Sequence, residues 1–237
     1  MSPEAKRRLQ IVLGAAVVLA AVRTGYIMYE RRQERAEPAK LQPAPLNLDY
    51  YVVPKRLHPY DLKSAKQLTQ QPVWVKEGYR YTYYPYNATS HRADLAHEAG
   101  LLLPIERLEI TDVVTNPSPG APGQKQVLAI FEKDGKQYAV PVGVAQGEDY
   151  TIYSDEMFYI QDPRALYKHW PADMWDAIAK HEVKTGMNEF QAVFSIGMGV
   201  PERSSDPSVK TVKYPNGGHP VTITYRDGKA AEITRGQ

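Results

Sequence analysis

The chain has 237 residues, a net charge of +2 at neutral pH and no cysteine. The missing cysteines exclude disulfide bonds, thiol catalysis, a lipidated N-terminal cysteine and cysteine-ligated zinc or iron–sulfur centres. The first 40 residues hold 8 Lys and Arg against 4 Asp and Glu, whereas the rest of the chain holds 21 against 23. Because the body carries no excess of positive charge, we expect no nucleic acid among its partners.

An apolar run near the N-terminus predicts that the chain is directed to a membrane. The run from Ile11 to Val22 is unbroken and follows basic residues at positions 6–8. Its 12 residues fit the hydrophobic region of a cleaved signal peptide, but residues 9–29 form a longer stretch with one charge, Arg23. We favour an uncleaved helix that contacts the lipid bilayer through residues 9–29, with cleavage as the alternative. Arg23 would place its guanidinium among the headgroups or pair with a partner helix.

The short tail before the apolar run is typical of a segment that stays in the cytoplasm. We therefore predict a single-pass protein of the bacterial inner membrane with its C-terminal body in the periplasm. A charged and then proline-rich linker would hold that body away from the bilayer. The predicted organisation is a membrane anchor with a short cytoplasmic tail at 1–29, the linker at 30–48, a β-rich domain at 49–162 and a C-terminal module at 163–237.

Residues 49–162 carry the pattern of a β-rich domain. Asp134-Gly135 lies between two apolar-rich segments, which is a strong signal for a β-hairpin. Several short strands at this spacing indicate a small barrel or a curled antiparallel sheet. The predicted elements are a short helix at 59–70 and strands at 73–75, 79–86, 105–115, 127–133, 136–144, 150–153 and 157–160.

Tyrosines crowd one of these predicted strands, at positions 79, 81, 83, 84 and 86. Tyrosine rings stack on sugars and are enriched in protein interfaces. We therefore take Tyr79, Tyr81 and Tyr83 as candidate partner-binding residues. The alternative is an edge strand whose tyrosines cover a small core.

The C-terminal residues change to a helical pattern followed by strands. Pro171 is placed to open a helix that reaches about Glu182, and Asn188 is placed to cap a second helix that ends at Ile196. This order predicts an αα-βββ module, so we expect an α+β fold preceded by an N-terminal transmembrane helix. The three strands are predicted at 209–214, 221–226 and 229–234, with glycine-containing turns between them.

Trp170 and Trp175 concentrate aromatic surface where the β-rich domain and the C-terminal module join. Tryptophan carries much of the binding energy in protein contacts, so both residues are candidate partner-binding residues. The pair could instead fill the hydrophobic seam between the two regions, and one cluster could serve both roles.

Short motifs in the C-terminal module give it a resemblance to a known family. Thr185-Gly186-Met187 leads a helix, Gly199-Val200-Pro201 follows it, and Tyr214 precedes a strand, Val221–Tyr225, that Asp227-Gly228-Lys229 closes. With these features, residues 183–233 resemble the small outer-membrane assembly lipoprotein E family and related two-helix, three-strand modules. The resemblance implies a layer that binds other proteins and performs no catalysis. The lipidated cysteine usual in that family is missing here, and the first 180 residues have no counterpart in it.

No catalytic motif stands out in the sequence. The densest group of candidate metal ligands is His91 and His97 with Asp94, which would help to hold zinc in a metal-dependent hydrolase. A solvated polar surface is the simpler explanation, because the spacing matches no zinc motif. We therefore predict no cofactor and no enzyme activity.

The sequence thus predicts a non-enzymatic, membrane-anchored accessory or assembly subunit. Its partners would be the membrane proteins of a multi-subunit complex, which it would bind through its extracytoplasmic body. A cell-wall or glycan-binding module that uses the tyrosine strand is the first alternative, and a metal-dependent hydrolase is the second.

Overall fold

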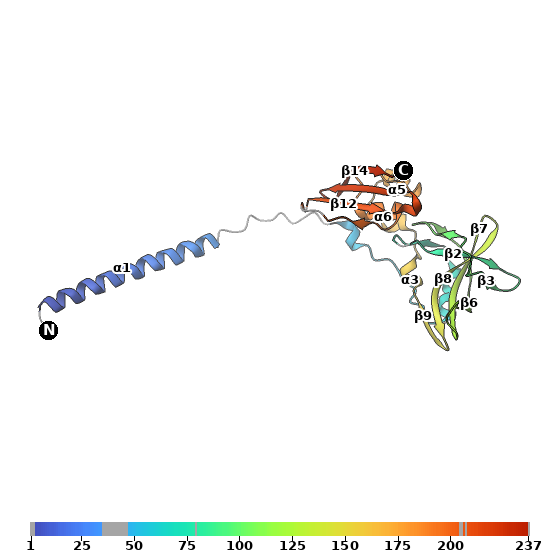
Figure 1. The fold of residues 1–237 in the computed structure, drawn as a ribbon, viewed down its shortest axis with the longest axis horizontal. Helices are drawn as coiled ribbons and strands as arrows, with labels where there is room; N and C mark the ends of the chain where they lie inside the picture. Colours follow the sequence, from blue (N-terminus) through green and yellow to red (C-terminus); the bar gives the residue numbers. More distant parts are fainter. Residues whose placement is uncertain (1–2, 35–46, 79, 204–205, 207, 237) are drawn as a thin grey trace. The chain divides into compact units, whose positions relative to one another are not determined.

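The computed structural model describes residues 3–34, 47–78, 80–203, 206 and 208–236. The chain divides into two compact units, Met1–Asn47 and Leu48–Gln237. We describe each unit by itself (Figure 1).

The first unit contains one long helix, α1 (Pro3–Glu34), which begins with proline. Proline is favourable there because the backbone amide of the first helical residue has no hydrogen-bond partner within the helix. The exposure of the residues of α1 is described at positions 14 and 18–32, and all of these are exposed. Much of the predicted apolar run at 11–22 lies outside the described side chains. Arg23 lies on α1 and is exposed. Within the described residues, no helix combines the length and the apolar character that crossing a membrane requires.

The second unit has an α+β fold built around a curled antiparallel sheet, as predicted. The Asp134-Gly135 turn joins the two longest strands, and both residues have positive φ angles, 53° and 72°. Such a turn matches the right-handed twist of the strands that flank it. The sheet runs in the order β3 (Arg92–Ala93), β2 (Thr82–Asn87), β8 (Lys136–Gln146), β7 (Gln124–Lys133) and β6 (Ile110–Pro117), with β4 (Gly100–Leu101) beside β2 and β9 (Asp149–Ile152) beside β8.

Residues 105–115 do not form one strand as predicted. Ile105 has a φ angle of 62°, which no β-strand accommodates. No strand therefore begins at this residue, and the rest of the segment is divided into β5 (Arg107–Leu108) and β6, which belong to different sheets. In the smaller sheet, β1 (Val73–Val75) lies between β5 and β10 (Phe158–Tyr159), and α3 (Ser154–Met157) precedes β10.

The predicted helix at 59–70 is also shorter and divided. It begins at α2 (Leu62–Ala65), because the carboxylate of Asp61 accepts a hydrogen bond from the backbone amide of Ser64 and caps the helix there. The chain then tightens into a 3₁₀ helix, η2 (Lys66–Gln70).

Asn116 on β6 links the two ends of the curled sheet. Its Oδ1 accepts a hydrogen bond from the Ala93 amide at 2.7 Å, and its Nδ2 donates to the His91 carbonyl at 3.1 Å. The side chain is buried, so both bonds are shielded from water. Two hydrophobic cores lie on opposite faces of β7: Val127, Ala129 and Phe131 belong to the main core, and Leu128 and Ile130 to a small core.

The C-terminal part contains α4 (Pro163–Leu166), α5 (Ala172–Ala179) and α6 (Glu189–Ile196). Asn188 caps α6 as predicted, in a reciprocal pair of hydrogen bonds with Gln191. Helix α5 ends earlier than predicted, because Lys180 closes its last turn and His181 has a φ angle of 54°. The sheet has four strands where three were predicted: β11 (Val200–Pro201), β12 (Val209–Tyr214), β13 (Val221–Arg226) and β14 (Lys229–Arg235), with a 3₁₀ turn, η3 (Asn216–Gly218), between β12 and β13.

An aromatic core holds this C-terminal part together. Phe194 on α6 is fully buried among the rings of Tyr167, Trp170 and Trp175. Trp74 and Ile105, which come from the region of β1 and β5, pack against this same core. The C-terminal core and the β-rich region therefore meet along a seam.

Candidate functional site: a groove at the seam

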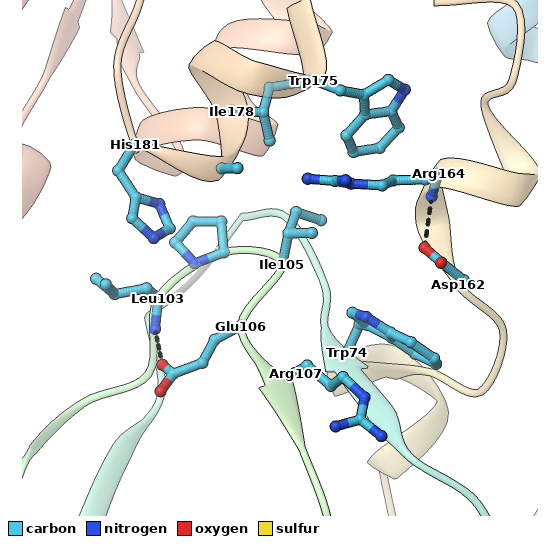
Figure 2. A pocket seen from close by; sticks show the side chains of 12 residues that line it. Trp74, Leu103, Ile105, Glu106, Arg107, Asp162, Arg164, Trp175, Ile178 and His181 are labelled. Atoms are coloured by element: carbon cyan, nitrogen blue, oxygen red, sulfur yellow. Dashed lines mark hydrogen bonds between the residues drawn. The ribbon is translucent and has the colours of Figure 1, made fainter. Parts of the chain in front are cut away.

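A groove with a cavity volume of about 540 Å³ opens at this seam. Trp74 on β1, Ile105 on the turn before β5, and Trp175 and Ile178 on α5 provide its apolar lining. Figure 2 shows these side chains converging from the two regions of the unit. The groove therefore depends on packing between segments that are far apart in the sequence.

Local structure explains how the two sides of the groove are formed. Trp175 and Ile178 are three residues apart on α5, so they lie on the same face of the helix. On the other side, the amide of Ile105 donates to the Val75 carbonyl at 2.9 Å and fixes the turn after Pro104. A positive φ angle is a strained state for a β-branched residue such as Ile105. Strain of this kind concentrates at functional sites, and here it places an isoleucine in the groove.

Two arginines are among the charged residues that line the groove. The Arg164 guanidinium lies 5.9 Å from the centre of the Trp175 ring and extends across the groove (Figure 2). Among the described residues it forms no ion pair. Arg107 is exposed and contacts Glu109 at 2.8 Å.

The carboxylates at the groove are engaged elsewhere. Glu106 accepts hydrogen bonds from the Leu103 amide at 2.9 Å and from Lys133 Nζ at 2.6 Å. Asp162 accepts from the Arg164 amide at 2.9 Å and caps α4. Because both acids already have cationic or backbone partners, Arg164 is the charged group best placed to meet a ligand.

His181 completes the groove, with its Nδ1 at 3.0 Å from the Ser195 carbonyl. A carbonyl oxygen can only accept, so Nδ1 carries the hydrogen in this contact. The lining includes no serine, threonine, cysteine or lysine that could act as a nucleophile. In the part of the chain that the structure describes, no group of three His, Asp or Glu residues could hold a metal ion.

The two predicted tryptophans lie together, with ring centres 5.2 Å apart. Each side chain is only 6% exposed. Trp170 stacks on Tyr167 and donates its Nε1 to Asp49, so it serves the core, whereas Trp175 also lines the groove.

The predicted tyrosines have a different setting. Tyr81 and Tyr83 are half-buried against the main core, and the Tyr83 ring lies 5.0 Å from that of Tyr138. Tyr79 lies outside the described residues. Because the rings of Tyr81 and Tyr83 are half-buried, they do not form a flat, exposed surface on which a sugar could stack. The glycan-binding alternative therefore stays a prediction.

The histidine cluster does not gather into a metal site. His97 Nδ1 lies 2.9 Å from Asp94 Oδ2, and both side chains are largely exposed. His91 contributes its backbone carbonyl to Asn116. The hydrolase alternative also stays a prediction.

Sequence reasoning missed most of the groove, including Trp74, Ile105, Arg164 and Ile178. No local sequence pattern connects them, because each comes from a different element or turn. The conformation of the turn at Ile105 could not be predicted from its residues. Comparisons of the chain with protein-family models, with curated proteins and with solved structures found no match.

A buried polar contact lies next to β1, where Trp74 pairs with Tyr159. The Tyr159 hydroxyl donates to Glu77 Oε2 at 2.5 Å. Burial raises the pKa of the Glu77 carboxyl above its ordinary value of 4.5, and this outweighs the hydrogen bond from Tyr159, which lowers it. Burial likewise lowers the pKa of the neighbouring Lys76 amine.

The raised pKa of Glu77 predicts a pH-dependent stability. The folded state binds this proton more tightly than the unfolded chain, so the stabilisation is full below pH 4.5 and is lost as the pH rises through the folded-state pKa. Glu77→Gln cannot titrate, and we expect its free energy of unfolding to rise relative to the wild type as the pH increases through this range. Urea unfolding at a series of pH values measures the difference. Glu148→Gln, at an exposed turn, is the control, and parallel profiles for Glu77→Gln and the wild type would contradict the assignment.

Proposed function

We propose that this protein is a non-enzymatic accessory or assembly subunit of a larger membrane protein complex, and that the groove at the seam binds a segment of a partner protein. The observation that carries the proposal is the groove itself, with an apolar lining crossed by the Arg164 guanidinium. Partner proteins commonly place an anchoring side chain in such a pocket and satisfy a charge at its rim. A partner segment with a large apolar side chain beside an acidic group would match both features.

Membrane attachment through residues 9–29 belongs to the same proposal. Its support is the sequence of that segment together with a helix, α1, that continues through all of it. The body would then lie in the periplasm, beside the partner membrane proteins. The resemblance of residues 183–233 to protein-binding assembly modules points in the same direction.

A substitution at Ala179 tests the groove directly. Ala179 is exposed on α5 and lines the groove, so Ala179→Arg is expected to fill part of it without disturbing the core. Loss of a central anchoring contact typically costs more than about 2 kcal/mol, so we expect recovery of the partner to fall by at least about tenfold. The measurement is mild-detergent extraction of native membranes, native-gel separation and mass spectrometry of the band that contains this chain.

Ala172→Arg is the matched control, because it introduces the same side chain at an exposed position of the same helix that does not line the groove. It is expected to retain the partner subunits. A wild-type chain that migrates alone would remove the subunit proposal. Partner subunits that remain bound to Ala179→Arg would instead place the interface elsewhere on the body.

A further inference from the structure

Residues 48–60 form a strap that connects the C-terminal core with the main core. The strap begins with a 3₁₀ turn, η1 (Leu48–Tyr51), and continues without regular structure. Val52 packs against the C-terminal core and Leu57 against the main core. The strap is therefore attached to both parts of the unit.

A buried carboxylate fixes the first end of the strap. The Asp49 side chain is 6% exposed and accepts hydrogen bonds from His169 Nε2 at 2.6 Å, Trp170 Nε1 at 2.7 Å and Asn188 Nδ2 at 3.1 Å. A carboxylate with several donors around it is held in one position.

Two more side chains hold the rest of the strap by its backbone. Gln161 Oε1 accepts from the Lys55 amide at 3.0 Å. The carboxylate of Asp155 accepts from the amides of Leu57 at 3.0 Å and His58 at 2.8 Å. Because its backbone is already fixed, the strap would lose little conformational entropy on binding a surface.

The outward side chains of the strap are large, apolar or aromatic. Tyr50 is 85% exposed, Val53 84% and Tyr60 76%, and Leu48 and Tyr51 are also more than half exposed. Single exposed apolar residues are common, but a cluster of this kind marks an interaction surface.

Basic residues are interleaved with these apolar ones. Lys55, Arg56 and His58 are exposed, whereas the side chain of Asp49, the only acidic residue of the strap, is buried. The outward surface of the strap therefore carries aromatic rings and positive charge with no exposed carboxylate of its own.

We propose that the strap binds the surface of an anionic lipid bilayer. Tyrosine is enriched at the depth of the headgroups, where its ring meets apolar chains and its hydroxyl meets water. Lys55 and Arg56 would face the lipid phosphates, and each basic residue near an anionic leaflet strengthens binding by about fivefold. Exposed cations with no exposed acid on the strap itself give it the charge that complements an anionic leaflet.

The position of the strap in the chain supports this occupant. Residues 35–47 separate the strap from α1, and a segment of that length spans at most about 45 Å. Membrane insertion of α1 is part of the proposed function, and this argument depends on it. If α1 is in the membrane, the linker keeps the start of the strap within its own length of the lipid. Tethering of this kind raises the effective concentration of the surface and makes even weak contacts persist.

The absence of cysteine from the chain allows a direct test. An environment-sensitive fluorophore would be attached to the full-length protein at Tyr50→Cys or Val53→Cys, both exposed positions. Glu148→Cys, at the exposed turn between β8 and β9, is the control, and Val18→Cys reports on α1. The proteins would be reconstituted into vesicles of phosphatidylcholine and phosphatidylglycerol that contain spin-labelled lipid, with circular dichroism as the check on folding.

We expect quenching at positions 50 and 53 to exceed that at position 148 by at least about twofold, and to fall at high salt because the attraction is screened. Adding Lys55→Gln and Arg56→Gln should lower the equilibrium constant for binding of the strap to the vesicle by up to about 25-fold, the product of two charges. Absence of quenching at 50 and 53 overturns the inference, whatever happens at position 18. Absence of quenching at position 18 alone removes the membrane anchor and leaves the strap inference standing. Shielding at 50 and 53 that requires co-purified proteins shows a protein occupant and overturns the lipid assignment.

Discussion

Asp49→Ala is expected to lower the free energy of unfolding by about 3–5 kcal/mol, the usual cost of removing one partner from a buried charged network. The substitution leaves the donors of His169, Trp170 and Asn188 without their shared acceptor. Unsatisfied buried donors lose their solvation without compensation, so the penalty exceeds the value of a single hydrogen bond. Urea denaturation followed by circular dichroism measures the change.

The neighbouring Tyr50 provides the control. Its side chain is 85% exposed, so Tyr50→Ala should change stability by less than about 0.5 kcal/mol. The loss in Asp49→Ala should be accompanied by faster hydrogen exchange at residues 48–58, because the strap detaches at that end. A stability close to that of the wild type, with the strap still protected, would show that Asp49 does not fix the strap.

Phe194→Ala is expected to cost about 3–5 kcal/mol, the range measured for removal of a buried phenylalanine ring. The Phe194 side chain is fully buried. Ring centres of Tyr159, Tyr167, Trp170, Trp175 and Phe190 lie between 4.9 and 6.2 Å from its own. Such a cavity cannot collapse easily, because rigid rings form most of its wall.

Thermal unfolding monitored by tryptophan fluorescence measures this loss, since Trp170 and Trp175 report on the cavity. Phe190→Ala is the matched control, because Phe190 is only partly buried against the same core and should cost less. Phe194→Leu should fall between the two, since it retains most of the apolar volume. Equal losses for Phe190→Ala and Phe194→Ala would mean that the core does not centre on Phe194.

Local signals predicted much of this fold. Asp134-Gly135 predicted the longest hairpin because few other residue pairs adopt two successive positive φ angles. Asn188 predicted the start of α6 because its side chain satisfies a free backbone amide within three residues. Both features are decided by neighbours in the chain, so they could be recognised without any tertiary information.

Other features depend on distant contacts and could not be predicted in this way. The positive φ angle of Ile105 could not be predicted, because isoleucine has no preference for such an angle and adopts it only where the surrounding structure requires it. Strand β11 has two residues, too few for any periodic pattern. The sequence also left open whether Trp170 and Trp175 face a partner or fill a core, because both environments favour the same residue type.

The groove illustrates the same limit for function. Its apolar lining joins Trp74, Ile105 and Ile178, whose separations in the chain carry no motif. Of the partner-binding candidates predicted from the sequence, only Trp175 is among the residues that line the groove. Chemistry that depends on a seam between two packed regions becomes visible only once the packing is known.

The side-chain link at Asn116 has a consequence for how this protein behaves when crowded. Strands at the rim of a sheet can recruit strands from neighbouring molecules and begin aggregation. Here the side chain of Asn116 accepts a hydrogen bond from the backbone amide of Ala93 and donates one to the carbonyl of His91. A strand from another molecule would otherwise bind these two backbone groups. The N-terminal part of β6 is shielded by η2, with Lys66 paired to Asp112 at 3.0 Å. The buried side chain of Asn116 thus leaves these two backbone groups unavailable to a strand from a neighbouring molecule.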